Sequence, residues 1–191
     1  MILTTFNNNL LQRITDLLST KFAITDLGIL KHFLGVTARR TSSGLFLSQE
    51  MYAKEILERE NMSNCKPAST PVETGSKLSV VLGAPLTDRS LYRSLAGTLQ
   101  YLTFTRPDST DAVQQVCLFM HVQRESHLEI LNRILCYLKG TIHHGLYFRA
   151  NQSLKLTQYT YADSGGCPDS LISTSGYCVI LGDNLISRSG K

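Results

Sequence analysis

Two pairs of residues in this 191-residue sequence have side chains that could bind a metal ion. His143 and His144 are adjacent, but a zinc site needs further ligands at defined spacings, so a position at a helix terminus or on the surface is the favoured interpretation. Asp163 and Asp169 lie in a glycine-rich stretch, where carboxylates could bind a cation or shape a turn, and turn chemistry is favoured. The sequence holds no H-E-x-x-H, phosphate-loop, dinucleotide-binding or nucleophile-elbow pattern. The residues by themselves therefore predict no active site.

Basic side chains are the second group that could do chemistry. Lys31, Arg39 and Arg40 flank a predicted hairpin, where they could contact phosphate groups or keep a sheet edge soluble, and the sequence leaves both open. The formal net charge is +4 and the pI is about 8.8. This charge permits nucleic-acid binding without requiring it.

Cysteine usage and hydropathy limit the cellular context. None of the five cysteines has C-x-x-C spacing, so reduced thiols and an intracellular protein are expected rather than a disulfide framework or a zinc site. No apolar stretch approaches the ~20 residues that span a bilayer. The N-terminus has neither the features of a secretory signal nor the arginines of a transit peptide. We expect no membrane partner and no defined small-molecule ligand, while the compartment stays open. The cysteines are Cys65, Cys117, Cys136, Cys167 and Cys178.

The elements that would position these groups follow from hydropathy patterns and turn residues. Apolar residues at helical spacing predict a helix over residues 9–20 and a second over 49–60, the latter capped by Ser48. Between them, residues 30–38 and 45–47 predict a hairpin, with Gly35 marking a bulge or a close backbone approach. Residues 65–86 hold three prolines and two glycines, which favour a linker.

The second half of the sequence changes from helical to strand patterns. Three helices are predicted, the first capped by Asp88, the second starting near Pro107 and the third running from a Ser126 cap to Gly140. The strands that follow are expected at residues 146–148, 154–161, 176–181 and 185–187. This order of elements indicates an α+β fold.

Many short segments of the sequence together resemble the polymerase polyprotein of copia-type LTR retrotransposons. They occur in the family's order and spacing along nearly the whole chain, covering the end of the reverse transcriptase and the start of RNase H. The segments include Phe33-Leu34-Gly35-Val36, Gly44-Leu45-Phe46-Leu47-Ser48-Gln49, Tyr92-Arg93-Ser94-Leu95-Ala96-Gly97, Thr105-Arg106-Pro107-Asp108, Tyr137-Leu138-Lys139-Gly140-Thr141 and Ser173-Thr174-Ser175-Gly176-Tyr177.

The resemblance implies a layout of four segments. Residues 1–64 would hold the end of the polymerase palm and a thumb-like segment, residues 65–87 a linker, residues 88–145 a helical connection, and residues 146–191 a truncated RNase H-like start. The family's Y-x-D-D turn, whose acids hold two metal ions, would immediately precede Ile2-Leu3-Thr4, so the metal-binding half of the palm is expected to be missing. The hairpin would correspond to the primer grip, with weak primer–template contacts from Phe33, Leu34, Gly35, Val36, Arg39 and Arg40.

The resemblance also implies that the RNase H site is broken. The family pattern Y-[ST]-D-A-D-W-A-G-C-P-D aligns with residues 159–169, and its first catalytic Asp falls at Tyr161. Two later positions also differ, since Ser164 and Arg188 stand where the family has tryptophan. A phenol does not replace the carboxylate that clamps two metal ions about 4 Å apart, so no Mg²⁺ is expected here although the parent family uses it. Three hypotheses stay open: an inactive fragment, a residual nucleic-acid-binding module, or a segment of a larger active polymerase.

Overall fold

The computed structural model describes residues 2–5, 7–73, 78–79, 83–150, 153–162 and 175–190. Its helices are α1 (Asn8–Lys21), α2 (Glu50–Arg59), α3 (Arg89–Leu102), α4 (Thr110–Leu118) and α5 (Glu125–Gly140), with the 3-10 helix η1 (Pro107–Ser109) before α4. Its strands are β1 (His32–Phe33), β2 (Val36–Thr41), β3 (Gly44–Ser48), β4 (Leu146–Arg149), β5 (Leu156–Ala162), β6 (Ser175–Leu181) and β7 (Asn184–Gly190). The predicted mixture of α and β structure is confirmed.

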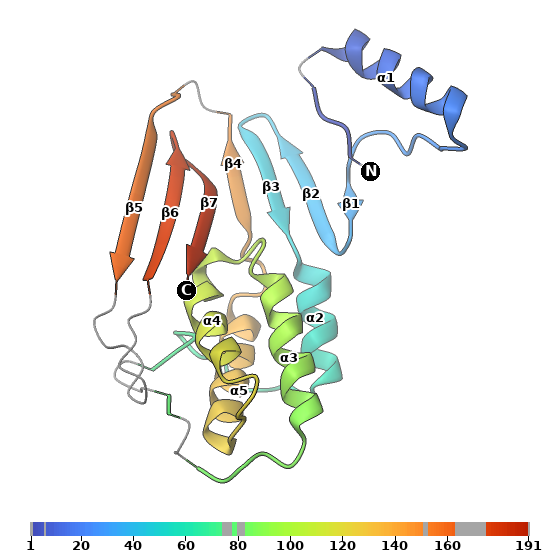
Figure 1. Cartoon of the computed structure of the whole chain (residues 1–191). Coiled ribbons are helices and arrows are strands. Elements are labelled where there is room, and N and C mark those ends of the chain that lie inside the picture. The colour runs from blue at the N-terminus through green and yellow to red at the C-terminus, as the bar shows by residue number, and fades with distance from the viewer. Residues whose placement is uncertain are drawn as a thin grey trace.

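The strands form two antiparallel sheets that lie beside one another at one end of the helices (Figure 1). The first sheet has the order β1-β2-β3-β4, and the second has the order β5-β6-β7. The side chain of Asn184 joins them, because its Oδ1 accepts from the Arg149 amide at 2.7 Å and its Nδ2 donates to the Arg149 carbonyl at 3.0 Å. One side-chain amide thus continues the hydrogen bonding between strands β4 and β7.

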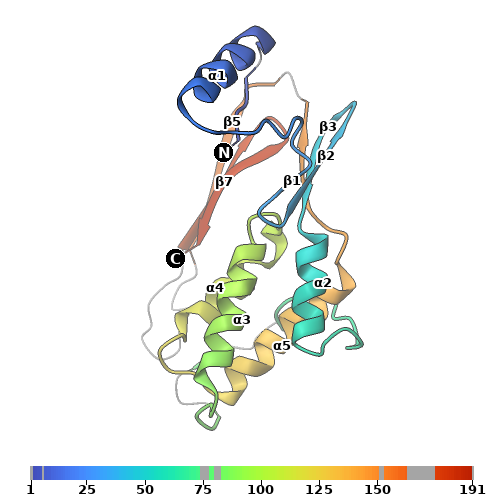
Figure 2. The same ribbon diagram turned by 90° about the vertical axis from the view of Figure 1, so that its right-hand side faces the viewer.

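The main core lies among helices α2 to α5, which stand together below the sheets (Figure 2). Apolar residues three or four apart face inward on each helix, as their spacing predicts. Tyr92 is fully buried on α3, and its hydroxyl donates to the Val116 carbonyl at 2.7 Å. Asp88 caps α3 as predicted, since its Oδ1 accepts from the amides of Ser90 at 3.0 Å and Leu91 at 2.9 Å.

Two of the predicted caps are wrong. Helix α2 begins after Gln49, because Ser48 ends strand β3 by pairing with Thr37. Helix α5 begins after Arg124, two residues earlier than a Ser126 cap would place it. Its start is stabilised by His127, whose Nδ1 accepts from the Arg124 amide at 3.2 Å. A serine near a helix start is a preference rather than a requirement, and tertiary contacts decided both positions.

The described parts of the predicted linker bond to α5 and to the segment just before it. The Ala68 amide donates to the Cys136 carbonyl at 3.2 Å, and the Leu86 amide donates to the Gln123 carbonyl at 3.1 Å. Leu78 joins the main core. Across the part of the chain that the structure describes, no helix is both long and apolar enough to cross a membrane.

Candidate functional site

The predicted hairpin strand over residues 30–38 is two strands joined by a tight turn. Phe33 pairs with Val36, and the two residues between them, Leu34 and Gly35, have φ angles of 48° and 75°. Positive φ at both central residues defines the turn type that matches the twist of a two-residue hairpin. Gly35 therefore serves the turn and not a bulge. Leu34 is 70% exposed, so the turn presents an apolar side chain to solvent.

Aromatic residues on α2 and α3 lie against this turn and hold it in place. The Tyr101 hydroxyl on α3 donates a short hydrogen bond to the Leu34 carbonyl. Tyr52 on α2 packs edge-on against Tyr101, with ring centroids 5.4 Å apart, and Phe104 packs on its other side at 5.6 Å. A Cβ at Gly35 would lie 3.9 Å from the Tyr52 Cβ, so the turn lies close to α2. No local sequence pattern predicts these contacts, because the partners are far apart along the chain.

The six residues expected to contact nucleic acid divide into two groups. Phe33, Leu34, Gly35 and Val36 lie together at the turn, whereas the two arginines lie further along β2 and point to opposite faces of the sheet. Arg39 pairs with Phe46, and its guanidinium carbon lies 5.3 Å from the centroid of that ring. Arg40 pairs with Leu45 on the other face.

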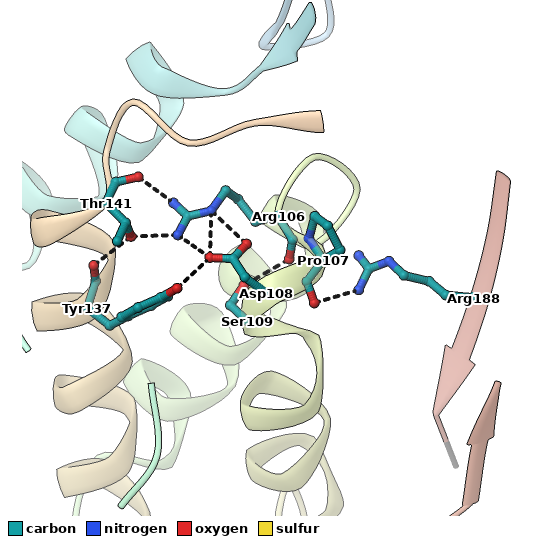
Figure 3. Close-up of polar contacts among 7 residues, drawn as sticks. All are labelled: Arg106, Pro107, Asp108, Ser109, Tyr137, Thr141 and Arg188. Carbon is teal, nitrogen blue, oxygen red and sulfur yellow. Dashed lines mark hydrogen bonds and ion pairs between the residues drawn. The ribbon is translucent and has the colours of Figure 1, made fainter. Parts of the chain in front are cut away.

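Residues from two of the family-like segments meet at a second place, between η1 and the end of α5 (Figure 3). Arg106 is buried and forms an ion pair with Asp108, with 2.7 Å between Nη2 and Oδ2. Its Nη1 donates to the Thr141 carbonyl at 3.0 Å and its Nη2 donates to the Thr141 hydroxyl at 2.6 Å. The Tyr137 hydroxyl donates to Asp108 Oδ2 at 2.8 Å.

This cluster is suited to stability rather than to proton transfer. Burial acts to raise the pKa of Asp108, but the hydrogen bonds and charge of Arg106, with the Tyr137 hydroxyl, outweigh it and hold that pKa below its usual value. The pKa of Tyr137 is raised by burial and by Asp108. Both groups therefore keep their ordinary protonation states at neutral pH, with Asp108 ionised and Tyr137 protonated. The cluster ties the start of α4 to the end of α5.

Tyr161 and Arg188 both reach from the second sheet to the corner between α3 and α4. The Tyr161 hydroxyl donates to Asp111 Oδ1 at 2.9 Å, and its ring lies over Gly176. Arg188 donates to the Pro107 carbonyl at 3.3 Å (Figure 3). It also donates to the Thr103 carbonyl. Burial and the bond to Asp111 raise the pKa of Tyr161. Its phenol is therefore protonated at neutral pH and already bonded.

Among the described residues, no group of three His, Cys, Asp or Glu side chains is placed to hold a metal ion. His143 and His144 are exposed beyond α5, and His143 Nδ1 lies 3.1 Å from Glu50 Oε2. Asp163 and Asp169, like Ser164, lie outside the described residues.

Comparisons with known proteins decide the family. A family model described as reverse transcriptase (RNA-dependent DNA polymerase) matches residues 1–74. The retrovirus-related Pol polyprotein from transposon RE1 of Arabidopsis thaliana is 45% identical over 191 residues, which is 100% of this chain and 13% of that protein. An uncharacterized mitochondrial protein of the same plant is 44% identical over 191 residues, and the match covers 79% of its length. The chain belongs to the copia-type retrotransposon Pol family.

Other matches extend the family beyond Arabidopsis. The Pol polyprotein from transposon TNT 1-94 of Nicotiana tabacum is 35% identical over 201 residues, covering 100% of this chain and 15% of that protein. This chain thus spans about one seventh of these long Pol polyproteins. No solved structure matches it.

Proposed function

We propose that this chain is a nucleic-acid-holding part of a retrotransposon reverse transcriptase polyprotein and catalyses no reaction by itself. The observation that carries the proposal is the β1–β2 turn. It presents the exposed Leu34 side chain and is fixed by Tyr101. A turn held in this way can contact the end of a primer with its backbone and with apolar side chains without reordering. It also lies within the residues that match the reverse transcriptase family model.

The proposed layout follows the order of the family. Residues 1–64 are assigned to the palm end and a thumb-like segment, residues 65–87 to a connecting segment, residues 88–145 to the helical connection, and residues 146–191 to the beginning of an RNase H-like part. Helices α3, α4 and α5 of the helical connection share one core, which also includes α2 of the first assigned segment. Strand β4 pairs with β3, which joins the last assigned segment to the first.

The lack of independent catalysis is supported by the state of Tyr161. Metal-dependent phosphoryl transfer needs carboxylates that clamp the ions. At the position where the family motif has an aspartate, this chain has a protonated phenol that is bonded to Asp111. The purified chain is expected to extend no primer and to cleave no RNA–DNA hybrid with Mg²⁺ or Mn²⁺. Incorporation above a no-protein control that survives stringent purification would contradict this.

Binding of a primer–template duplex tests the holding function. Fluorescence anisotropy with a labelled duplex should show weak, sequence-tolerant binding that falls steeply with salt. The matched variants are Leu34→Asp and Leu34→Asn, because both residues tolerate a positive φ angle and only the first adds a negative charge. One repelled phosphate at short range costs about 1 kcal/mol, so Leu34→Asp should bind about five-fold more weakly than Leu34→Asn. Equal affinity of the two variants would show that the turn is not part of the binding surface.

A second candidate is that the same residues work within a longer, active polymerase. The 45% identity to the RE1 polyprotein over only 13% of its length favours it. Sequencing the transcript upstream of the Met1 codon distinguishes the two. An in-frame Y-x-D-D palm on the same message would support the longer polymerase, and a stop codon would support the separate chain.

A further inference from the structure

Three side chains form a row across one face of the first sheet. Arg39 on β2 pairs with Phe46 on β3, and Phe46 pairs with Tyr147 on β4. Directly paired residues of antiparallel strands point to the same face, so this row places a guanidinium beside two aromatic rings. Strands β2, β3 and β4 lie side by side in Figure 1.

The aromatic rings of this row are held in position and are only half-buried. The Tyr147 hydroxyl lies 2.6 Å from Ser43 Oγ and 3.1 Å from Thr41 Oγ1, which fixes the tilt of its ring. The Phe46 ring lies against the backbone at Gly145, where an added Cβ atom would come within 2.7 Å of the Phe46 Cζ. Both rings keep part of their surface open to solvent.

A shallow recess adjoins Phe46 and enlarges the open surface. Its volume is about 380 Å³, and it is lined by Phe46, Pro107, Asp108, His143, His144 and Gly145. This volume falls within the range of small-molecule sites and could accept a nucleotide base. Aromatic and imidazole groups line it together, and both kinds of ring can stack on a base.

The charge around this row favours an anionic ligand. Asp108, which lines the recess, is paired with Arg106, and Glu50 is paired with Lys54 and lies 3.1 Å from the recess-lining His143. Arg39 makes no ion pair with any described residue, so its charge is available to a ligand.

We propose that the row of Arg39, Phe46 and Tyr147 binds single-stranded nucleic acid. Bases stack on the Tyr147 ring and on the part of the Phe46 ring that the Arg39 guanidinium does not cover, and Arg39 contacts a phosphate of the same strand. The proposal rests on the proposed nucleic-acid binding of the chain and adds to it a surface separate from the β1–β2 turn. A single strand is the expected form, because the bases of a duplex are stacked on one another and cannot reach side chains on a sheet face.

The test is fluorescence anisotropy of the whole chain with a short labelled oligothymidylate, alongside the labelled duplex. Base stacking on one aromatic ring is worth a five-fold change in affinity or more, so Phe46→Leu should weaken oligothymidylate binding by about five-fold or more. Arg39→Gln should also weaken binding and reduce the salt dependence by about one phosphate contact. Circular dichroism of each variant checks that the fold is kept.

Arg89→Gln is the matched control. It removes the same charge from the exposed start of α3, at the opposite end of that helix from Tyr101, which contacts the first sheet, so binding should change by less than about two-fold. Equal losses from Arg39→Gln and Arg89→Gln would mean unspecific attraction to net charge, and would overturn the proposal. Duplex binding without oligothymidylate binding would also overturn it while leaving the proposed function intact. Binding of neither probe would end both proposals.

Discussion

Replacing Asp108 with asparagine removes the carboxylate that neutralises a buried guanidinium. The Arg106 side chain is 3% exposed and that of Asp108 is 31% exposed. The distance between Arg106 Nη2 and Asp108 Oδ2 is 2.7 Å. Breaking a buried ion pair by removing one partner costs about 3–5 kcal/mol, since the remaining charge has lost its partner away from water. Arg106 keeps two hydrogen bonds to Thr141, and Asp108 is partly solvated, so we expect the lower end, about 3 kcal/mol.

Urea unfolding followed by circular dichroism measures this loss. A domain of this size has a total stability of about 5–15 kcal/mol, so Asp108→Asn should shift the midpoint clearly to lower urea. In a thermal scan the same loss should lower Tm by about 6–12 °C. The double variant Arg106→Met, Asp108→Leu should recover much of the loss, because neither partner is then left as an unpaired buried charge.

Tyr137→Phe is the control for the polar network. It removes only the hydroxyl that donates to Asp108 and leaves the ion pair in place. The expected cost is about 1–2 kcal/mol, which is less than that of Asp108→Asn. If Asp108→Asn cost less than about 1 kcal/mol, or no more than Tyr137→Phe, the reasoning from the buried charge would be refuted.

Two further predictions concern pH and glycine. The pKa of Asp108 is depressed in the folded chain, so this carboxylate stabilises the fold fully at neutral pH, and its contribution is lost as pH falls below the pKa of the unfolded chain, about 3.9. Urea midpoints should stay level from neutral to mildly acidic pH and drop in strong acid. Asp108→Asn should flatten that drop. An alanine at Gly176 would overlap the Tyr161 ring, so Gly176→Ala should destabilise by about 1–3 kcal/mol. Gly97 on α3 has open space around it, so Gly97→Ala should stabilise by about 0.5–1 kcal/mol, and the opposite order in urea titrations would contradict both.

The helices were predictable because their signals are local. Residues 9–20 were expected as a helix and form α1 over Asn8–Lys21, and Asp88 caps α3 as its side chain predicts. The β1–β2 turn could not be read in the same way. Leucine rarely takes a positive φ angle, so Leu34-Gly35 lacks the usual Asn-Gly signal of a two-residue hairpin.

The polar clusters could not be predicted because their partners are distant in sequence. The segment Thr105-Arg106-Pro107-Asp108 was recognisable as a motif, but nothing local shows that Arg106 bonds Thr141 or that Tyr137 bonds Asp108. Period-two alternation did allow Arg39 and Arg40 to be placed on opposite faces once β2 was known. Which face carries the aromatic rings depends on the pairing of β2, β3 and β4, and β4 lies about a hundred residues further along the chain.

Helix α1 has no buried side chains, and this determines how easily it unfolds. Leu10 is 46% exposed and Leu17 is 59% exposed, so the helix gains little from packing and relies on its own hydrogen bonds and the Asn7 cap. Isolated helices of about 14 residues are marginal in water. Segments of this kind open locally at almost no free-energy cost while the rest of a domain stays folded. We therefore expect the amides of α1 to exchange with solvent far faster than those of α3 and α5, and this helix to melt separately from the cooperative unfolding of the core.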